Sequence, residues 1–265
     1  MRMRLGLSTA AYYGRFETED AALAIARLPV DCAEVFLQTG SEYEPAFAQL
    51  VRENLGSISC TSVHPTGIQF ENQMFGRSLR QRRDAFAVYE RVLDAANVLG
   101  AKYYVYHGRS TAQLTALAWD LEANLRVLRD MHEAAAERNI AVAWENVFWC
   151  QLTNEERIAK VRDVFPDARF TLDIKQAMRA GCDPVKMIDV MGSGLANVHV
   201  CDWMANGKLC LPGEGEFDFD ALFAALRKNG YDGPVILEPY LALVESDETL
   251  MRSLEFLRSK MRSAK

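Results

Sequence analysis

The sequence predicts a (β/α)₈ barrel, and three observations support that prediction. Short apolar runs alternate with longer segments of helical period, and this cycle repeats along the chain. The 265 residues contain no glycine- or serine-rich linker, so the repeats are expected to form one unit. The turn after the first run reads GLSTAAYYG, which is not the GxGxxG turn of an open nucleotide-binding sheet. We therefore expect a single barrel domain over residues 1–265.

Eight apolar runs supply the expected strands. Their interiors are apolar on both faces, which is typical of parallel strands that helices cover on the outside. In chain order the runs are 3–8, 33–38, 58–64, 102–108, 140–146, 169–173, 196–202 and 234–239.

Segments of helical period fill the gaps between these strands. Thr18 is a candidate N-cap for the helix after the first strand, and the longest helix is expected over 116–139. A later helix should begin at Asp218, a good N-cap, and end at Gly230, a typical C-terminal stop. The segment GEGEF (213–217) lacks the third glycine of a nucleotide loop, so we expect it to be a loop that enters this helix.

The composition argues against several classes of function. The net charge is −6 and the sequence pI is about 5.4, which disfavours a nucleic-acid binder. The six cysteines form no CxxC pair, so we expect reduced thiols in a cytoplasmic protein. No signal peptide and no apolar segment of membrane-spanning length is visible, so no membrane partner is expected.

Acidic residues and histidines gather at the ends of the expected strands. Three of the four histidines lie there, whereas His132 lies mid-helix and is expected to be a surface or packing residue. From the third strand to the eighth, the strand-end residues are His64, His107, Glu145, Asp173, His199, Asp202 and Glu238. Core packing or helix capping explains any one of them, but closing the sheet brings all of them to one rim.

Carboxylates that converge on one rim repel one another and raise each other's pKa values. A divalent cation relieves that repulsion. Mixed carboxylate and imidazole ligands suit Mn²⁺, Zn²⁺, Co²⁺ or Mg²⁺. We therefore expect Glu145, which follows the buried run AVAW, to face a metal ion.

Seven short motifs follow one another along the chain: VHP (63–65), VYHGR (105–109), WENV (144–147), TLDIKQA (171–177), VHVCD (198–202), LPGEGEFDF (211–219) and ILEPY (236–240). With these motifs the sequence resembles a known family, the xylose isomerase-like barrels, also called sugar phosphate isomerases/epimerases. The same superfamily contains the zinc-dependent apurinic endonucleases (AP endonuclease family 2). The seven motifs together carry the resemblance. Their order and spacing cover nearly the whole chain.

The ketose 3-epimerase branch of this family holds one metal with four residues from strands five to eight. The resemblance implies that Glu145, Asp173, His199 and Glu238 are the corresponding ligands here. It also implies that Glu145 and Glu238 act as acid and base on opposite faces of the substrate. Mn²⁺ is the expected metal, with Zn²⁺, Co²⁺ or Mg²⁺ as alternatives.

The endonuclease branch implies a second metal on His64, His107 and the shared Glu145. The alternative role for these two histidines is hydrogen bonding to the substrate or to the ligands. A third zinc needs a histidine where this chain has Gln176, and an Asp-x-His motif that the chain also lacks. The missing third site counts against hydrolysis of DNA.

Several further residues are candidates for substrate contacts. Gln176 stands where many sugar isomerases carry a histidine that contacts a substrate hydroxyl, and it can both donate and accept hydrogen bonds. Lys175 beside it can reach an anion. Trp149, Trp203 and Tyr240 follow metal-bearing strands and can wall a sugar ring, with packing at the barrel mouth as the alternative.

The sequence therefore predicts a metal-dependent isomerase or epimerase (EC 5) of a sugar, sugar acid or cyclitol that works through an enediolate. The alternatives are a lyase or dehydratase (EC 4.2) of a keto-sugar or keto-cyclitol, and a dinuclear hydrolase similar to the AP endonucleases. A non-catalytic sugar-binding barrel is a third alternative, against which the complete ligand set argues. We expect a small-molecule carbohydrate substrate and a homodimer or homotetramer.

Overall fold

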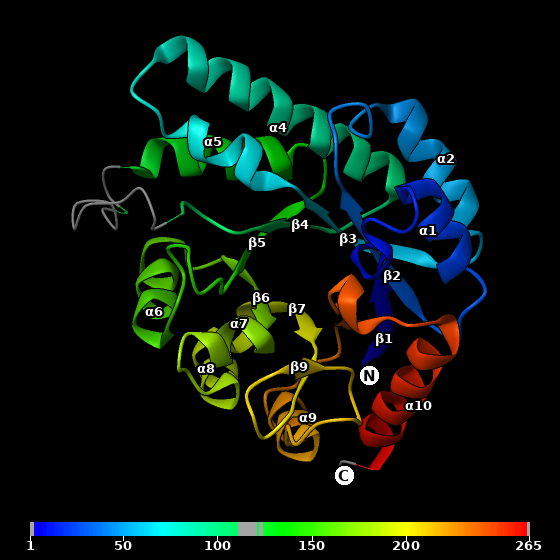
Figure 1. Cartoon of the computed structure of the whole chain (residues 1–265). Helices are drawn as coiled ribbons and strands as arrows, with labels where there is room; N and C mark the ends of the chain where they lie inside the picture. The colour runs from blue at the N-terminus through cyan, green and yellow to red at the C-terminus, as the bar shows by residue number, and fades with distance from the viewer. Residues whose placement is uncertain (1–2, 111–120, 122–123, 264–265) are drawn as a thin grey trace.

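The computed structural model describes residues 3–110, 121 and 124–263, and its eight parallel strands close into a barrel (Figure 1). The predicted fold class is confirmed. The strand order around the barrel is β1-β10-β7-β6-β5-β4-β3-β2. The strands are β1 (Arg4–Ser8), β2 (Cys32–Leu37), β3 (Ser59–Pro65), β4 (Tyr103–Tyr106), β5 (Ala141–Glu145), β6 (Arg169–Asp173), β7 (Leu195–Val200) and β10 (Pro234–Leu237). Each of the eight predicted runs overlaps one of these strands, and β2, β3 and β7 each extend one residue beyond the predicted run.

Helices surround the barrel on its outside, as Figure 1 shows. They are α1 (Thr18–Ile25), α2 (Pro45–Leu55), α3 (Glu71–Met74), α4 (Leu79–Leu99), α5 (Leu125–Ala136), α6 (Glu155–Val164), α7 (Ile174–Arg179), α8 (Pro184–Met191), α9 (Phe219–Lys228) and α10 (Asp247–Ser263). A short antiparallel hairpin of β8 (Asp202–Trp203) and β9 (Leu209–Cys210) follows β7.

One predicted helix cap is confirmed and another is wrong. The Asp218 carboxylate accepts a hydrogen bond of 2.9 Å from the third backbone amide of α9, and Gly230 follows the helix with a φ of +69°. Thr18 is not an N-cap, because Glu17 holds that position. The Thr18 hydroxyl is buried and donates to Glu42 Oε2 over 3.1 Å, so it is turned away from the helix amides.

The prediction of the longest helix over 116–139 is wrong in its extent. Residues 116–120 and 122–123 lie outside the described part of the chain. Within that part Leu121 lies in a turn, and α5 begins only after Asn124, a residue type that favours caps over helix interiors. The longest of the described helices is α4, with 21 residues.

The interior of the barrel is apolar at most positions but holds polar side chains from the middle of the strands to their carboxyl ends. One large core cluster joins the strands to the inner faces of the helices. Within the barrel, however, Glu34, Ser62, Asn197 and His199 are all almost completely buried. Buried polar groups need hydrogen-bond or charged partners, so these side chains are expected to bind one another or a ligand at the carboxyl-terminal end of the barrel.

Three predictions from composition and position can be checked against the structure. None of the six cysteines, all of which are described, forms a disulfide. His132 is a packing residue: its ring stacks on Phe165 with centroids 5.1 Å apart, and its Nε2 accepts from Trp144 Nε1 over 3.2 Å. Among the described helices, none is long and apolar enough to cross a membrane.

A glycine in β1 makes the tight pairing of the first strand possible. A Cβ on Gly6 would lie 2.9 Å from the carbonyl oxygen of Cys32, a backbone atom that cannot move away. We expect Gly6→Ala to lower the free energy of unfolding by about 1–3 kcal/mol in chemical denaturation, because the strands must separate. Gly40→Ala is the matched control, since a Cβ there meets nothing within 4 Å. Equal stability of the two variants would contradict this account.

Candidate metal centre

Four barrel strands carry the predicted metal ligands to the rim, meaning the carboxyl ends of the strands. Glu145 and Asp173 are the last residues of β5 and β6, and His199 pairs with Asp173 across β6 and β7. Glu238 directly follows β10. Each of the four residues offers one possible ligand atom, and these atoms lie within 4.8 Å of one another. We call these four residues the acidic cluster.

The Nδ1 atom of His199 points into the acidic cluster. It lies 3.3 Å from Glu238 Oε2, 3.5 Å from Glu145 Oε1 and 3.9 Å from Asp173 Oδ2. This nitrogen is buried and makes no hydrogen bond. Three carboxylates and one imidazole nitrogen are a donor set that suits a divalent cation, so the residues present fit a metal.

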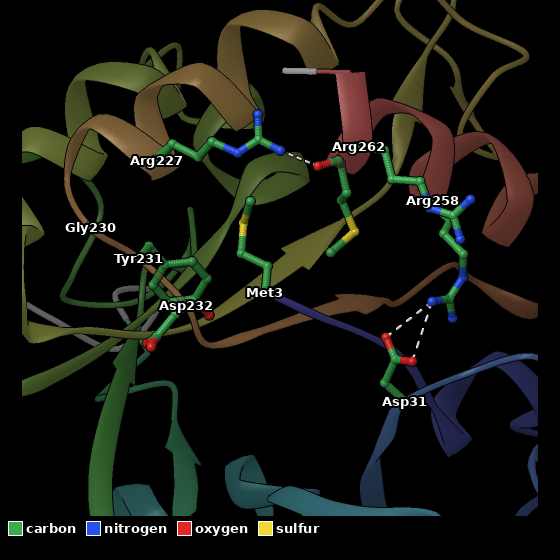
Figure 2. A pocket seen from close by; sticks show the side chains of 9 residues that line it. Met3, Asp31, Arg227, Gly230, Tyr231, Asp232, Arg258 and Arg262 are labelled. Carbon is green, nitrogen blue, oxygen red and sulfur yellow. Dashed lines mark hydrogen bonds and ion pairs between the residues drawn. The ribbon is translucent and has the colours of Figure 1, made fainter. Parts of the chain in front are cut away.

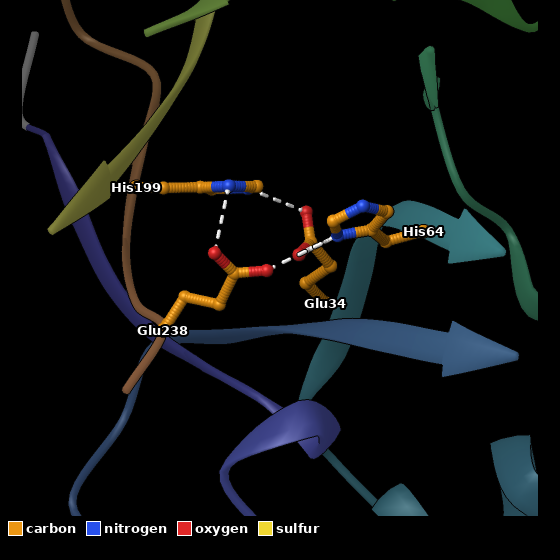
Figure 3. A group of neighbouring side chains, drawn as sticks. All are labelled: Glu34, His64, His199 and Glu238. Carbon is orange, nitrogen blue, oxygen red and sulfur yellow. Dashed lines mark hydrogen bonds and ion pairs between the residues drawn. The ribbon is translucent and has the colours of Figure 1, made fainter. Parts of the chain in front are cut away.

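Glu34, which the sequence analysis did not single out, fixes the orientation of His199 (Figure 3). Its Oε2 lies 2.9 Å from His199 Nε2 and also accepts from the Ser62 hydroxyl over 2.7 Å. Burial raises the pKa of Glu34, but the His199 charge and the hydrogen bonds from His199 and His64 lower it to about 2. An ionised Glu34 can only accept, so His199 Nε2 donates to it and Nδ1 is directed toward the cluster.

The two histidines of strands three and four form a pair beside the acidic cluster. His64 Nε2 lies 2.6 Å from His107 Nε2, and His107 Nε2 lies 2.9 Å from Glu145 Oε2. On its other side, His64 Nδ1 lies 3.1 Å from Glu238 Oε1. The structure thus brings together His64, His107 and Glu145 as a second group of possible ligands.

Lys175 and Gln176 belong to the same site because α7 starts directly after Asp173. The Lys175 ammonium donates to both Asp173 Oδ2 and Glu238 Oε2. The backbone amide of Gln176 donates to Asp173 Oδ1 over 2.9 Å, and the Gln176 Oε1 is buried without a hydrogen bond. Asn146 holds Asp173 from the other side, accepting from its amide and donating to its carbonyl.

A cavity of about 300 Å³ opens above the acidic cluster. Of the four cluster residues, Glu145 and Glu238 line this cavity, whereas Asp173 and His199 are buried and do not line it. The complete lining is Ala10, Tyr13, Phe36, His64, His107, Glu145, Lys175, Gln176, Glu238, Pro239, Tyr240 and Leu241. The cavity therefore combines carboxylates, histidines and an amide with aromatic walls, a mixture typical of a small polar ligand site.

The two tryptophans proposed as cavity walls lie outside that lining. The Trp149 ring packs against His107, with centroids 5.9 Å apart, so it contacts a residue that lines the cavity. Trp203 lies in the β8–β9 hairpin, where its backbone amide donates to Asp202. The Asp202 carboxylate also accepts from the amides of Gly213, Gly215 and Phe217. The GEGEF segment is thus a loop anchored by Asp202, as a loop entering α9 requires.

A second cavity, of about 390 Å³, lies beside the amino ends of the barrel strands (Figure 2). Its lining includes Met3 and Asp31, and Arg258 pairs with Asp31 over 3.3 Å. None of the strand-end acids or histidines of the rim lines it. The candidate site is therefore the cavity at the rim.

The comparisons with known proteins agree with this architecture. A family model for xylose isomerase-like TIM barrels matches residues 22–260, so the chain belongs to that family. An uncharacterised protein of Mycobacterium leprae is 25% identical over 286 residues, with 97% of both chains covered.

Solved structures show the same fold at low sequence identity. A D-psicose 3-epimerase from Clostridium cellulolyticum matches with a TM-score of 0.80 and 18% identity, covering 98% of this chain and 99% of that one. A 3-keto-D-glucoside 4-epimerase from E. coli matches with 0.74 and 19%, over 97% and 100%. The IOLI protein with a bound zinc atom matches with 0.77 and 18%, over 99% and 98%.

The buried carboxyl of Glu71 should make the stability of the folded protein depend on pH. Glu71 is 2% exposed and accepts a hydrogen bond of 2.7 Å from the Tyr104 hydroxyl. Burial raises its pKa from 4.5 to about 7, against the opposing effects of the His107 charge and the Tyr104 hydrogen bond. The unfolded chain releases this proton near pH 4.5, so the folded state loses stability as the pH rises from there to about 7.

We expect Glu71→Gln to raise the free energy of unfolding by about 3 kcal/mol at pH 8, because the amide cannot ionise. The gain should shrink as the pH falls and vanish below pH 4.5, as measured by denaturation with urea at several pH values. The exposed Glu255→Gln, within α10, should change stability by less than about 0.5 kcal/mol throughout. A Glu71→Gln variant no more stable than wild type at pH 8 would refute the assignment.

The contact between Glu34 and His199 gives a prediction about metal affinity. We expect Glu34→Gln to weaken Mn²⁺ binding by about 10- to 100-fold in isothermal titration calorimetry, because the carboxylate that accepts from His199 Nε2 is replaced by a neutral amide, which is a weaker acceptor and makes the imidazole a less basic ligand. Glu44→Gln, an exposed carboxyl in the loop after β2, is the control and should bind Mn²⁺ as wild type does. Unchanged affinity in the Glu34 variant would show that His199 is oriented without it.

Proposed function

We propose that this chain is a divalent-metal-dependent isomerase or epimerase of a sugar, sugar acid or cyclitol. The observation that carries the proposal is the division of the acidic cluster. Glu145 and Glu238 line the cavity, while Asp173 and His199 are buried and do not line it, so two carboxylates are available to a ligand and all four residues can share one ion. The structural neighbours named as psicose and keto-glucoside epimerases support the same class of reaction.

A divalent cation held by the acidic cluster would supply Lewis acidity toward the carbonyl oxygen of a hydroxyketone. Glu145, Asp173, His199 Nδ1 and Glu238 would hold it. Mn²⁺ is the expected ion, with Zn²⁺, Co²⁺ or Mg²⁺ as alternatives, and the zinc atom in the IOLI protein supports a metal of this kind.

Glu145 and Glu238 are the proposed acid and base. Glu145 comes from β5 and Glu238 from the end of β10, with β6 and β7 between them around the barrel. One carboxylate takes the proton next to the substrate carbonyl, which gives an enediolate, and the other returns a proton to the opposite face. Return to the same carbon inverts it, whereas return to the neighbouring carbon interconverts aldose and ketose. Gln176 and the histidine pair line the same cavity and can bind substrate hydroxyls.

Hydrogen exchange with D₂O tests this proposal. The Mn²⁺-loaded protein should exchange a carbon-bound hydrogen of a ketohexose, keto-glycoside or keto-cyclitol with solvent deuterium. The loss of the substrate's proton NMR signal measures this exchange. We expect Glu238→Gln to slow the exchange by about 10²- to 10⁴-fold because a proton-transfer group is lost. The exposed Glu245→Gln should exchange at the wild-type rate.

Mn²⁺ content of the Glu238 variant, measured in parallel, separates loss of the base from loss of the metal. Full exchange with Mn²⁺ retained would refute the role of Glu238. Loss of water from a keto-cyclitol, in place of exchange, would move the assignment to a lyase.

The group of His64, His107 and Glu145 favours a second candidate, a dinuclear metal-dependent hydrolase. Elemental mass spectrometry of protein purified without a histidine tag distinguishes the two candidates. One metal ion per chain agrees with the isomerase or epimerase. Two zinc ions per chain would favour the hydrolase.

A further inference from the structure

The Lys175 ammonium lies within the acidic cluster. Only 5% of the side chain is exposed, and Nζ donates to Asp173 Oδ2 and Glu238 Oε2 at once. Lys175 is the second residue of α7, which begins directly after Asp173, and its side chain turns back toward that carboxylate. Burying a lysine is costly unless anions compensate its charge, and these two carboxylates supply that compensation.

The same two carboxylates belong to the proposed metal site. A transition-metal ion bound to both would lie about 2 Å from an oxygen of each. It would then stand within a few ångströms of an ammonium that shares those oxygens, in a site from which most water is excluded. Two positive charges at such a distance repel each other strongly, so the ammonium and the metal ion compete for these carboxylates.

Building on the proposed function, we propose that Lys175 is the resident cation of the acidic cluster and that a divalent metal binds by displacing its ammonium into the cavity. The cavity offers a place for the displaced group. Lys175 already lines it, and the centre of the Tyr240 ring lies 5.8 Å from Nζ. Displacement lowers the affinity for metal below that of the four ligands alone. It also brings the ammonium to the space that substrate oxygens would occupy.

Direct metal binding tests this inference. Lys175→Met keeps most of the length of the side chain and removes its charge. We therefore expect Mn²⁺ to bind at least tenfold more tightly, measured by calorimetry and by the electron paramagnetic resonance signal of free Mn²⁺. Lys175→Gln should change the affinity in the same direction. Without metal both variants should melt below wild type, because Asp173 and Glu238 then repel each other. Mn²⁺ should raise their melting temperatures by more than that of wild type.

Lys208→Met is the control, because Lys208 is an exposed lysine in the hairpin after β7 and its loss changes the net charge equally. Its Mn²⁺ affinity should equal that of wild type. Equal affinity in wild type and both Lys175 variants would overturn the inference and leave the proposed function standing. Weaker binding in the Lys175 variants would also overturn it. Failure of wild type and all variants to bind Mn²⁺, Zn²⁺, Co²⁺ or Mg²⁺ would overturn the inference and the metal-dependent function together.

Discussion

Three carboxylates buried at one end of a closed barrel repel one another, and the arrangement of the rim follows from the need to compensate their charge. Burial raises the pKa of Asp173 to about 7, and the Lys175 charge works against that rise. The charge of Lys175 and that of His199 also hold the pKa of Glu238 well below its ordinary value, against the effect of burial. Without such partners three acids in this space would not stay ionised together, and an ionised set is what a metal site requires.

The barrel places these groups with little freedom. Asp173 and His199 are register partners in adjacent strands, and Asn146 fastens the end of β5 to that of β6 through two hydrogen bonds to the Asp173 backbone. Strand ends are more rigid than loops, so the spacing of the cluster is fixed by sheet geometry. The loop after the β8–β9 hairpin is attached to the same rim by Asp202, whose carboxylate accepts four backbone hydrogen bonds.

The sequence predicted the parts of this design that depend on periodicity and on strand ends. Apolar runs that alternate with segments of helical period predict all eight strands. Because the carboxyl ends of these parallel strands meet at one rim of the closed barrel, the same pattern predicts which residues converge there. Contacts between distant segments were harder to predict. Glu34 is the single charged residue in the apolar run CAEVFL. Because a strand that is covered on both faces cannot expose a carboxylate to solvent, this charge was the available sign that Glu34 binds another buried polar group.

Side-chain direction accounts for the remaining differences. The position of Lys175 after β6 indicates that it can reach an anion, but nothing in the linear order shows that its side chain turns back to Asp173 and across to Glu238. Threonine is a good N-cap residue, yet the hydroxyl of Thr18 donates a hydrogen bond to Glu42, which lies in the connection between β2 and α2. Trp203 follows β7, the strand of the proposed ligand His199, but a short hairpin holds it outside the cavity lining.

The central claim is that one divalent cation is shared by Glu145, Asp173, His199 and Glu238. Anomalous diffraction from crystals soaked in Mn²⁺ tests it most directly, because the signal locates the ion without reference to any activity. The account predicts one strong peak within bonding distance of these four side chains, with the Lys175 ammonium moved away from Asp173 and Glu238. A peak between His64 and His107 alone, or no peak at the rim in Mn²⁺-saturated crystals, would contradict it.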